Sequence, residues 1–263
     1  MLKISGIGKT FFPGTVNERR ALDGLNLEMK EGDFVTVIGS NGAGKSTLLN
    51  AVSGRLFVDT GTVAIDGVVV NRMSEHKRAR YVGRVFQDPL AGTAPNLSIE
   101  ENLSLALLRG KPRGLGLSLS TKRREEFREQ LTTLELGLED RLTAKVGLLS
   151  GGQRQALSLL MAGFTNPKIM LLDEHTAALD PQRAELVTTL TQKIVDQGGL
   201  TTLMVTHNME QAIRLGNRLI MMHEGRIVYE ADQATKKKLT VRDLLKEFAT
   251  IKGATLSDKA LLG

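Results

Sequence analysis

Nine residues determine how this chain folds: Gly39-Ser40-Asn41-Gly42-Ala43-Gly44-Lys45-Ser46-Thr47. An apolar run, Phe34 to Ile38, precedes this stretch, and another apolar run, Leu48 to Val52, follows it. The predicted order is therefore strand, glycine-rich loop and helix. The positions of the glycines and of the Lys-Ser pair match a phosphate-binding P-loop. The sequence thus predicts an α/β fold built around a phosphate site.

Each residue type in this loop suits a polyphosphate ligand. Glycines allow the backbone N–H groups to approach the phosphates closely, and the helix N-terminus adds the positive end of its dipole. Lys45 is placed to reach the β- and γ-phosphates, and the Ser46 hydroxyl is placed to bind Mg²⁺. We therefore expect residues 39–47 to bind the phosphates of a nucleotide. A glycine-rich turn without a ligand is the alternative, which the flanking strand and helix disfavour.

Length and composition fit a globular protein with a sizeable core. The chain has 263 residues, of which 41% are hydrophobic and 24% charged, so one α/β domain with a subdomain is expected. It contains no run of ~20 apolar residues, and residues 1–6 lack the apolar stretch of a signal peptide. The absence of cysteine excludes disulfides and thiolate metal sites. The net charge of +6 is compatible with nucleic acid or an anionic membrane as partner, but most such charges are simply solvated surface.

Hydrophobic periodicity and turn residues predict the remaining elements. Strands are expected at 2–12, 22–30, 81–86, 168–172 and 201–206, and hairpins at 61–70 and 218–229. The basic stretch 76–80 is interpreted as a solvated helix face. Helices are expected at 98–108, where Ser98 and Glu101 form a capping box, and at 121–135, 154–164, 241–248 and from 178–181 to about 197. Residues 111–120 read as a loop.

Four of the predicted strands end in residues that can act on a nucleotide. The P-loop follows the first, and Gln87, the pair Asp173-Glu174 and His207 follow the others. Ligands of α/β sheets bind outside the carboxyl ends of the strands, so these residues are expected to converge. Asp173 can hold Mg²⁺ through water, and Glu174 can polarise a water in line with the γ-phosphorus. His207 or Gln87 alone would more often be structural, but their joint placement indicates a site.

The order of these motifs resembles that of an ABC transporter ATPase subunit. The segment Leu149-Ser150-Gly151-Gly152-Gln153 is identical to the LSGGQ signature of that family, and it comes just before the Asp173-Glu174 strand. The P-loop, Gln87, Asp173-Glu174, residues 178–180 and His207 correspond to Walker A, Q-loop, Walker B, D-loop and H-switch. The resemblance covers about residues 1–230. It implies a P-loop NTPase core of mixed sheet and helices, with an N-terminal antiparallel β subdomain and a helical subdomain inserted at about 88–163.

The resemblance also implies specific roles for these residues. Glu174 would be the catalytic base, with Lys45, Gln87 and His207 also in the catalytic machinery. Ser46, Gln87 and Asp173 would hold Mg²⁺. The signature residues Ser150 to Gln153 would contact ATP bound by a second subunit, and Asp180 would bridge the two subunits. Phe11 and Phe12 are both candidates for the aromatic residue that stacks on adenine.

At the level of the whole protein, the resemblance predicts a single ATPase domain at 1–250 followed by a C-terminal tail at 251–263. The chain would form a homodimer at the inner face of the cell membrane, in the cytoplasm, bound to integral-membrane permease subunits and through them to an extracytoplasmic solute-binding protein. Direct nucleic-acid binding is not expected. The segments 86–93 and 173–180 are similar to those of bacterial amino-acid importers, in which aromatic substrates occur. His175 departs from the usual proline or small residue.

Two other functions remain as alternatives. A soluble ABC ATPase acting on nucleic acid or ribosomes would fit the basic charge, but such proteins carry two cassettes or a long coiled coil. Here there is one cassette, and Lys45 and Ser150 are about 105 residues apart without sustained heptads. The other alternative is a module that binds ATP without turnover, which an intact Glu174 and His207 disfavour.

Overall fold

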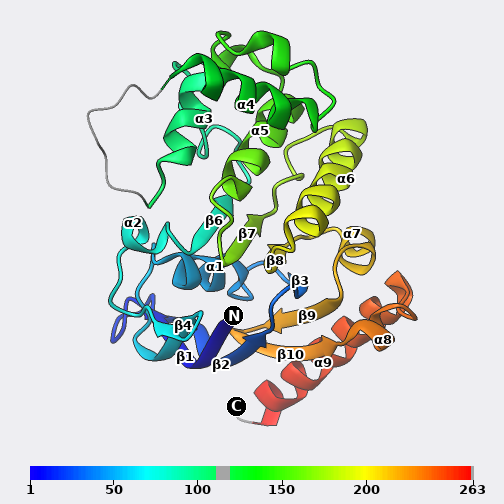
Figure 1. The fold of residues 1–263 in the computed structure, drawn as a ribbon. Coiled ribbons are helices and arrows are strands. Elements are labelled where there is room, and N and C mark those ends of the chain that lie inside the picture. Colours follow the sequence, from blue (N-terminus) through cyan, green and yellow to red (C-terminus); the bar gives the residue numbers. More distant parts are fainter. Residues whose placement is uncertain (111–118, 262–263) are drawn as a thin grey trace.

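The computed structural model describes residues 1–110 and 119–261, and these form two sheets with helices around them (Figure 1). The first sheet is antiparallel, in the order β2-β1-β4-β5. Its strands are β1 (Leu2–Phe11), β2 (Arg19–Met29), β4 (Thr60–Ile65) and β5 (Val68–Val69). The second sheet has the order β10-β9-β3-β8-β7-β6. Its strands are β3 (Phe34–Gly39), β6 (Val82–Val85), β7 (Ile169–Asp173), β8 (Thr202–Val205), β9 (Arg218–His223) and β10 (Arg226–Ala231).

The helices cover both faces of the second sheet. They are α1 (Lys45–Ser53), α2 (Glu75–Arg78), α3 (Ile99–Leu107), α4 (Thr121–Thr132), η1 (Glu139–Arg141), η2 (Val146–Leu148), α5 (Gly151–Gly163), α6 (Pro181–Gly198), α7 (Met209–Arg214), α8 (Gln233–Lys236) and α9 (Val241–Leu261). Those from α3 to α5 lie between β6 and β7 in the chain and gather at one end of the molecule (Figure 1). The predicted fold class, including the inserted helical subdomain, is thereby confirmed.

The sheet core follows from the alternation of side chains along each strand. Ile169 and Leu171 of β7 join an apolar cluster that also contains α1 and the antiparallel sheet, so α1 lies between the two sheets. Met170 and Leu172 point to the opposite face and join the cluster formed with α3, α5 and α6. A buried parallel strand needs apolar residues on both faces, and β7 supplies them.

Most predicted elements are present, with changes at their ends. Ser98 caps α3 as expected: its Oγ accepts from the Glu101 amide at 3.3 Å, and Glu101 Oε2 accepts from the Ser98 amide at 2.6 Å. Helix α5 begins at Gly151, three residues earlier than predicted, because Ser150 caps it in the same way. Both predicted hairpins form, around Asp66-Gly67 and Glu224-Gly225. Most of the loop predicted at 111–120 lies outside the described residues.

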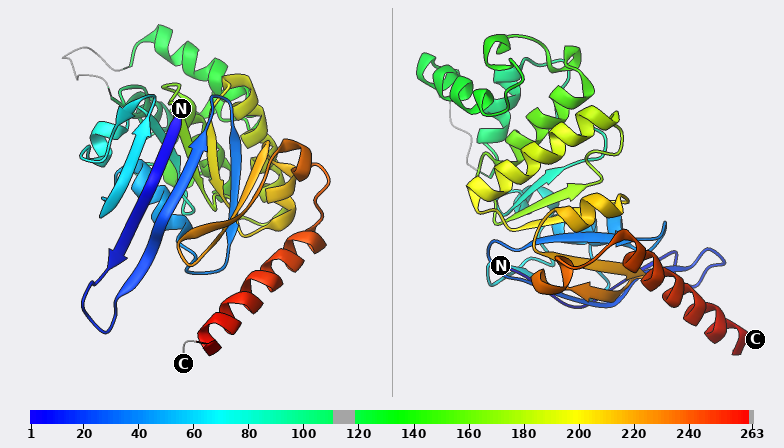
Figure 2. Two further views of the ribbon diagram at one scale, coloured as in Figure 1. Left: turned by 90° about the horizontal axis from the view of Figure 1, so that it is seen from below. Right: turned by 90° about the vertical axis from the view of Figure 1, so that its right-hand side faces the viewer.

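The C-terminal helix is longer than predicted. Instead of ending at Phe248, α9 continues to Leu261, since Leu244, Phe248 and Ile251 recur on one face that packs against a third apolar cluster, and no proline follows. The helix then projects away from the sheets (Figure 2). It runs across residue 250, so the predicted boundary between domain and tail stays a prediction.

The predicted solvated face at 76–80 is wrong for Arg78. This side chain is fully buried, because its guanidinium donates to four carbonyl oxygens, those of Ala51, Val52, Asn71 and Met73. Two of these belong to the last turn of α1, whose carbonyl groups have no partner inside the helix. Arg78 therefore closes the C-terminal end of the P-loop helix.

Candidate active site

The register of the parallel strands places the predicted catalytic segments side by side. Val37 of β3 pairs with Val205 of β8, and Val205 pairs with Asp173 of β7. These residues form one row across the sheet. The P-loop after β3, Glu174 after β7 and His207 after β8 therefore leave the sheet at the same edge, as the sequence predicted.

The P-loop has the backbone conformation that its glycines permit. Gly42 and Gly44 have φ of 83° and 99°, in the left-handed region. A Cβ on Gly39 would lie 2.4 Å from the carbonyl oxygen of Met222, so only glycine fits there. Helix α1 begins at Lys45, and the free amide groups of its first turn therefore face the loop.

Lys45 lies over this loop. It is only 7% exposed, and its Nζ donates to the carbonyl oxygens of Gly39 at 2.8 Å and Ser40 at 3.1 Å. Burial lowers the pKa of Lys45, and the nearby carboxylates of Glu174 and Asp173 partly oppose that shift. The ammonium is thus held between the loop and the two acidic residues after β7.

A hollow of about 320 Å³ lies over the P-loop. Phe11, Glu174 and most of the P-loop line it, all residues that the sequence analysis selected. Arg19 and Ala21, which the sequence analysis did not select, also line it. The P-loop residues in the lining are Asn41, Gly42, Ala43, Gly44, Lys45, Ser46 and Thr47. Phe12 does not line the hollow. Its side chain is 67% exposed, and its φ of 52° belongs to the turn after β1. Of the two aromatic candidates, the geometry favours Phe11.

Glu174 and His207 face each other beside the P-loop. Their Oε2 and Nδ1 atoms are 3.5 Å apart, and both residues line a second hollow that adjoins α6 and α7. The backbone of Glu174 has a φ of 44°, which is uncommon for a residue with a side chain. Its amide donates to the Val205 carbonyl at 2.9 Å, and its carbonyl accepts from the Ala177 amide at 2.9 Å. These bonds hold the carboxylate at the end of β7.

The donor set at this edge fits Mg²⁺. Ser46, which has a hydroxyl, lines the P-loop hollow, and Asp173 supplies a carboxylate near Lys45. Within the described part of the chain no cluster of three or more His, Cys, Asp or Glu residues could hold a metal. Mg²⁺ is typically bound by only a few protein oxygens, and phosphates and water complete its coordination. Gln87 is exposed and does not line the hollow, so its role stays a prediction.

The signature residues do not line the P-loop hollow of their own chain. Ser150 caps α5, accepting from the Gln153 amide at 3.3 Å, and Gln153 Oε1 accepts from the Ser150 amide at 3.1 Å. A Cβ on Gly152 would lie 3.3 Å from the Arg183 side chain. Asp180 caps α6, accepting from the Arg183 amide at 3.1 Å. The helix start at Ser150 therefore packs close to the start of α6.

Arg84 is a residue at the site that the sequence analysis missed. Its Nη2 donates to Asp173 Oδ2 at 2.8 Å, and its Nη1 donates to Asn50 Oδ1 at 2.8 Å and Ser53 Oγ at 3.2 Å. The guanidinium also lies 4.8 Å from the ring centre of Phe86. Arg84 thus joins α1, the end of β7 and the strand that leads to Gln87. A charged residue in an apolar strand needs a partner inside the protein, so the position of Arg84 in the strand was the sequence signal that could have identified it.

His175 is fully packed inside the protein. It is 2% exposed, and its Nε2 lies 2.8 Å from Thr191 Oγ1, whose proton is donated to the Val187 carbonyl at 2.7 Å. Thr191 must therefore accept, which assigns the proton of the neutral ring to Nε2. Burial lowers the pKa of His175 to about 4. The residue after the predicted base is thus a neutral anchor between β7 and α6.

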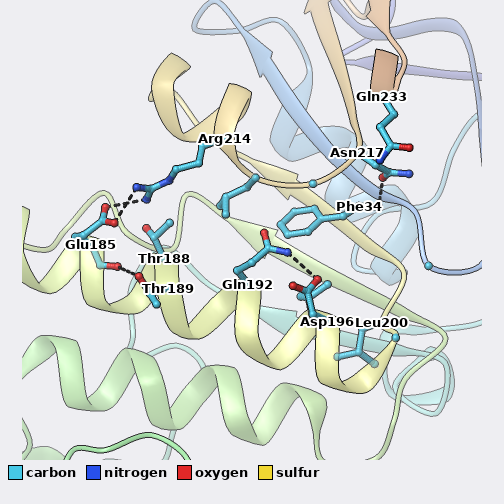
Figure 3. A pocket seen from close by; sticks show the side chains of 15 residues that line it. Phe34, Glu185, Thr188, Thr189, Gln192, Asp196, Leu200, Arg214, Asn217 and Gln233 are labelled. Atoms are coloured by element: carbon cyan, nitrogen blue, oxygen red, sulfur yellow. Dashed lines mark hydrogen bonds and ion pairs between the residues drawn. The ribbon is translucent and has the colours of Figure 1, made fainter. Parts of the chain in front are cut away.

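A larger hollow lies elsewhere, beside α6 (Figure 3). It measures about 730 Å³, and Phe34 and Leu200, which precede or begin parallel strands, are part of its lining. It is therefore at the amino ends of the strands, away from the P-loop. Glu185 and Arg214 cross its rim with two bonds of 2.8 Å. None of the predicted catalytic residues lines it.

Comparison with known proteins decides the family. Residues 22–177 match the family described as ABC transporter, which is more than half of the chain. The chain belongs to the ABC transporter family. It is 45% identical over 249 residues to the tyrosine transport ATP-binding protein of Clostridioides difficile, covering 94% of this chain and 98% of that protein. It is 32% identical to the glutamate transport ATP-binding protein GluA of Corynebacterium efficiens, covering 94% and 97%.

Solved structures of ABC cassettes have the same fold. The ATP-binding cassette MJ0796, in a dimeric post-hydrolysis state bound to ADP and Pi, superposes with a TM-score of 0.75 at 33% identity over 89% of this chain and 99% of that one. These comparisons confirm the prediction of an ABC-type ATPase whose ATP hydrolysis energises transport. Among the described residues, no helix has both the length and the apolarity needed to cross a membrane.

Replacing Arg84 tests its link to Asp173. An Arg84→Met variant keeps the bulk of the side chain but leaves the Asp173 carboxylate without its partner in a poorly hydrated position. We expect the free energy of unfolding, measured by urea denaturation, to fall by about 2 kcal/mol. Arg80→Met, at an exposed position just before β6, should change it by less than about 0.5 kcal/mol. Adding Asp173→Asn to Arg84→Met should cost less than the sum of the single variants, and strict additivity would contradict the link.

The buried His175 predicts a dependence of stability on pH. As the pH falls below 6.5, the unfolded chain binds a proton at this residue, whereas the folded chain resists until about pH 4. Stability at His175 is therefore full above pH 6.5 and is lost between 6.5 and about 4, by about 3 kcal/mol. The free energy of unfolding, measured by urea denaturation at several pH values between 6.5 and 4, should fall less steeply with falling pH for His175→Gln than for wild type. The exposed His76→Gln should keep the wild-type slope, and an unchanged slope in both variants would refute the assignment.

Proposed function

We propose that this chain binds ATP with Mg²⁺ at the P-loop, acts as a homodimer and drives the import of an amino acid through a separate permease. The convergence of Lys45, Glu174 and His207 at one sheet edge is the observation that carries the proposal. ATP hydrolysis needs a cradle for the phosphates, a base for water and a group near the γ-phosphate, and these residues supply all three.

Each residue has a defined part in this mechanism. The P-loop amides and Lys45 bind the β- and γ-phosphates, and Phe11 stacks on the adenine from the far side of the hollow. Ser46, Asp173 and Gln87 would hold Mg²⁺, which would supply positive charge to neutralise the phosphates. Glu174 accepts a proton from the attacking water. His207, within 3.5 Å of Glu174, orients that water and contacts the γ-phosphate.

The signature segment completes the site of a second copy. Ser150, Gly151, Gly152 and Gln153 form the N-terminus of α5, which carries free amide groups and the positive end of the helix dipole. They do not line their own P-loop hollow, so they are available to the γ-phosphate of a partner. Asp180, at the start of α6 beside the signature, would lie at the same dimer interface. The dimeric form of the cassette MJ0796 supports this arrangement.

The relatives with amino-acid names support the proposed substrate class. Besides the tyrosine and glutamate transport proteins, a methionine import ATP-binding protein, MetN of Rhizobium johnstonii, is 36% identical over 80% of this chain. The 45% identity to the tyrosine protein extends over nearly the full length of both chains, which favours an aromatic amino acid. The chain would work in the cytoplasm at the inner face of the membrane, with the permease and an extracytoplasmic solute-binding protein.

Removing the predicted base tests the mechanism. In Glu174→Gln the side chain keeps its size but cannot accept a proton, so we expect phosphate release to fall more than about 100-fold while ATP binding is retained. With ATP and Mg²⁺ present, this variant should accumulate as a dimer in size-exclusion chromatography. Glu28→Gln, an exposed carboxylate on β2, should hydrolyse ATP at the wild-type rate. A Glu174→Gln variant with undiminished turnover would show that another group is the base.

The substrate is tested with the assembled transporter. The tagged chain should co-purify from its native membranes with a multi-span permease and a solute-binding protein. When these are reconstituted into proteoliposomes, tyrosine should stimulate ATP hydrolysis more than methionine, glutamate or a sugar does. Stimulation by a sugar alone would contradict the amino-acid assignment. Recovery of ribosomal or DNA-binding proteins without a permease would contradict the transporter function.

A further inference from the structure

Arg19 lies at the mouth of the P-loop hollow. It is the first residue of β2, and it pairs directly with Phe11, the last residue of β1. Side chains at paired positions of an antiparallel ladder point to the same face of the sheet. Both side chains line the hollow together with the P-loop. Arg19 therefore stands beside the aromatic ring at which the base is expected.

The guanidinium of Arg19 rests on the loop itself. Its Nη2 donates to the carbonyl oxygen of Gly42 at 2.9 Å. A Cβ on Gly42 would lie 2.3 Å from that nitrogen, so a side chain at this position would displace the guanidinium from the loop. Gly42 thus serves the approach of Arg19 in addition to the turn of the loop.

The next residue provides a natural contrast. Successive side chains of a strand point to opposite faces, and Arg20 accordingly turns away from the hollow. Its Nη1 lies 3.2 Å from Asp23 Oδ1, and Arg226 also pairs with Asp23. The two adjacent arginines therefore have different surroundings, one at a carboxylate and one at a phosphate-binding loop.

The charge of Arg19 is not neutralised by the described part of the chain. No carboxylate there lies within 4.0 Å of its guanidinium, and its one hydrogen bond to the described residues is to a backbone carbonyl. A guanidinium has five N–H donors in a planar fork that suits phosphate oxygens. Lys45 bonds to the carbonyl groups of Gly39 and Ser40, at the start of the loop. Two cations, Arg19 and Lys45, therefore line the hollow together with the loop.

We propose that Arg19 binds the polyphosphate of the nucleotide near its ribose end. The inference rests on the proposed ATP site. A nucleotide with its base on Phe11 and its terminal phosphates on the loop amides and Lys45 must pass Arg19 between these two points. The phosphate next to the ribose therefore accepts hydrogen bonds from N–H groups of the guanidinium that do not bond to Gly42. Because ATP and ADP share this phosphate, Arg19 adds affinity for both and does not distinguish between them.

Equilibrium binding of nucleotides by the full chain tests this role. A fluorescent ADP analogue would be displaced by ATP, by ADP and by inorganic tripolyphosphate, in the presence of Mg²⁺. Arg19→Gln keeps an N–H donor for Gly42 but loses the charge, and we expect each of the three ligands to bind about 10-fold more weakly. Arg19→Lys should stay within about 3-fold of wild type because it keeps the charge. Arg20→Gln should bind all three as wild type does.

The loss should also shrink at high salt, since an exposed charge–charge contact is screened. Three outcomes would overturn the inference: wild-type affinity in Arg19→Gln, loss for ATP and ADP but not for tripolyphosphate, or an equal loss in Arg19→Lys. The second would place Arg19 at the base or ribose, and the third would reduce it to a support for Gly42. If wild type itself binds no ATP, the proposed function fails instead. Thermal unfolding of each variant without nucleotide identifies any loss that comes from misfolding.

Discussion

The site depends above all on the backbone hydrogen bonds between β3, β8 and β7. The Thr206 amide donates to the Val37 carbonyl at 3.1 Å, and the Glu174 amide donates to the Val205 carbonyl at 2.9 Å. These bonds lie at the last rung of the parallel ladder, where the strands give way to the catalytic segments. A slip of one residue would turn every side chain of a strand to the other face of the sheet. The apolar residues on both faces of β7 oppose such a slip, so core packing also fixes the catalytic geometry.

Positive charge organises the surroundings of this edge. Arg78 closes the C-terminal end of α1, Arg84 ties the same helix to Asp173, and Lys45 lies at its N-terminal end. Cationic side chains therefore bind at both ends of the P-loop helix. Arg78 and Arg84 come from other elements and contact its C-terminal half, and Lys45 belongs to its first turn. Each of them is bound to carbonyl, amide or carboxylate oxygens, as buried charges must be. These contacts fix the position of α1 relative to the end of β7.

Much of this could be predicted from the sequence because the chemistry is carried by short contiguous motifs. Residue type and position after an apolar run identify residues 39–47, Asp173-Glu174 and His207 as site residues. The signature segment specifies the family. Phe11 could not be separated from Phe12, since the turn that exposes Phe12 depends on the three-dimensional path after β1. Arg78 and Arg84 could not be assigned either. The α1 carbonyl groups that Arg78 binds, those of Ala51 and Val52, are 27 and 26 residues away in the chain, and Asp173 is 89 residues from Arg84. Long-range contacts of this kind leave only a weak trace in a single sequence.

The backbone at Glu174 carries a consequence for the evolution of the chain. A φ of 44° costs a residue with a side chain on the order of 1 kcal/mol, which glycine would avoid and asparagine would reduce. The residues that adopt this backbone conformation at the lowest cost, glycine and asparagine, thus cannot serve as the base. Selection for stability and selection for turnover pull this one position in opposite directions. A lineage that no longer needed hydrolysis would be expected to lose its glutamate early, and to become sturdier as it did so.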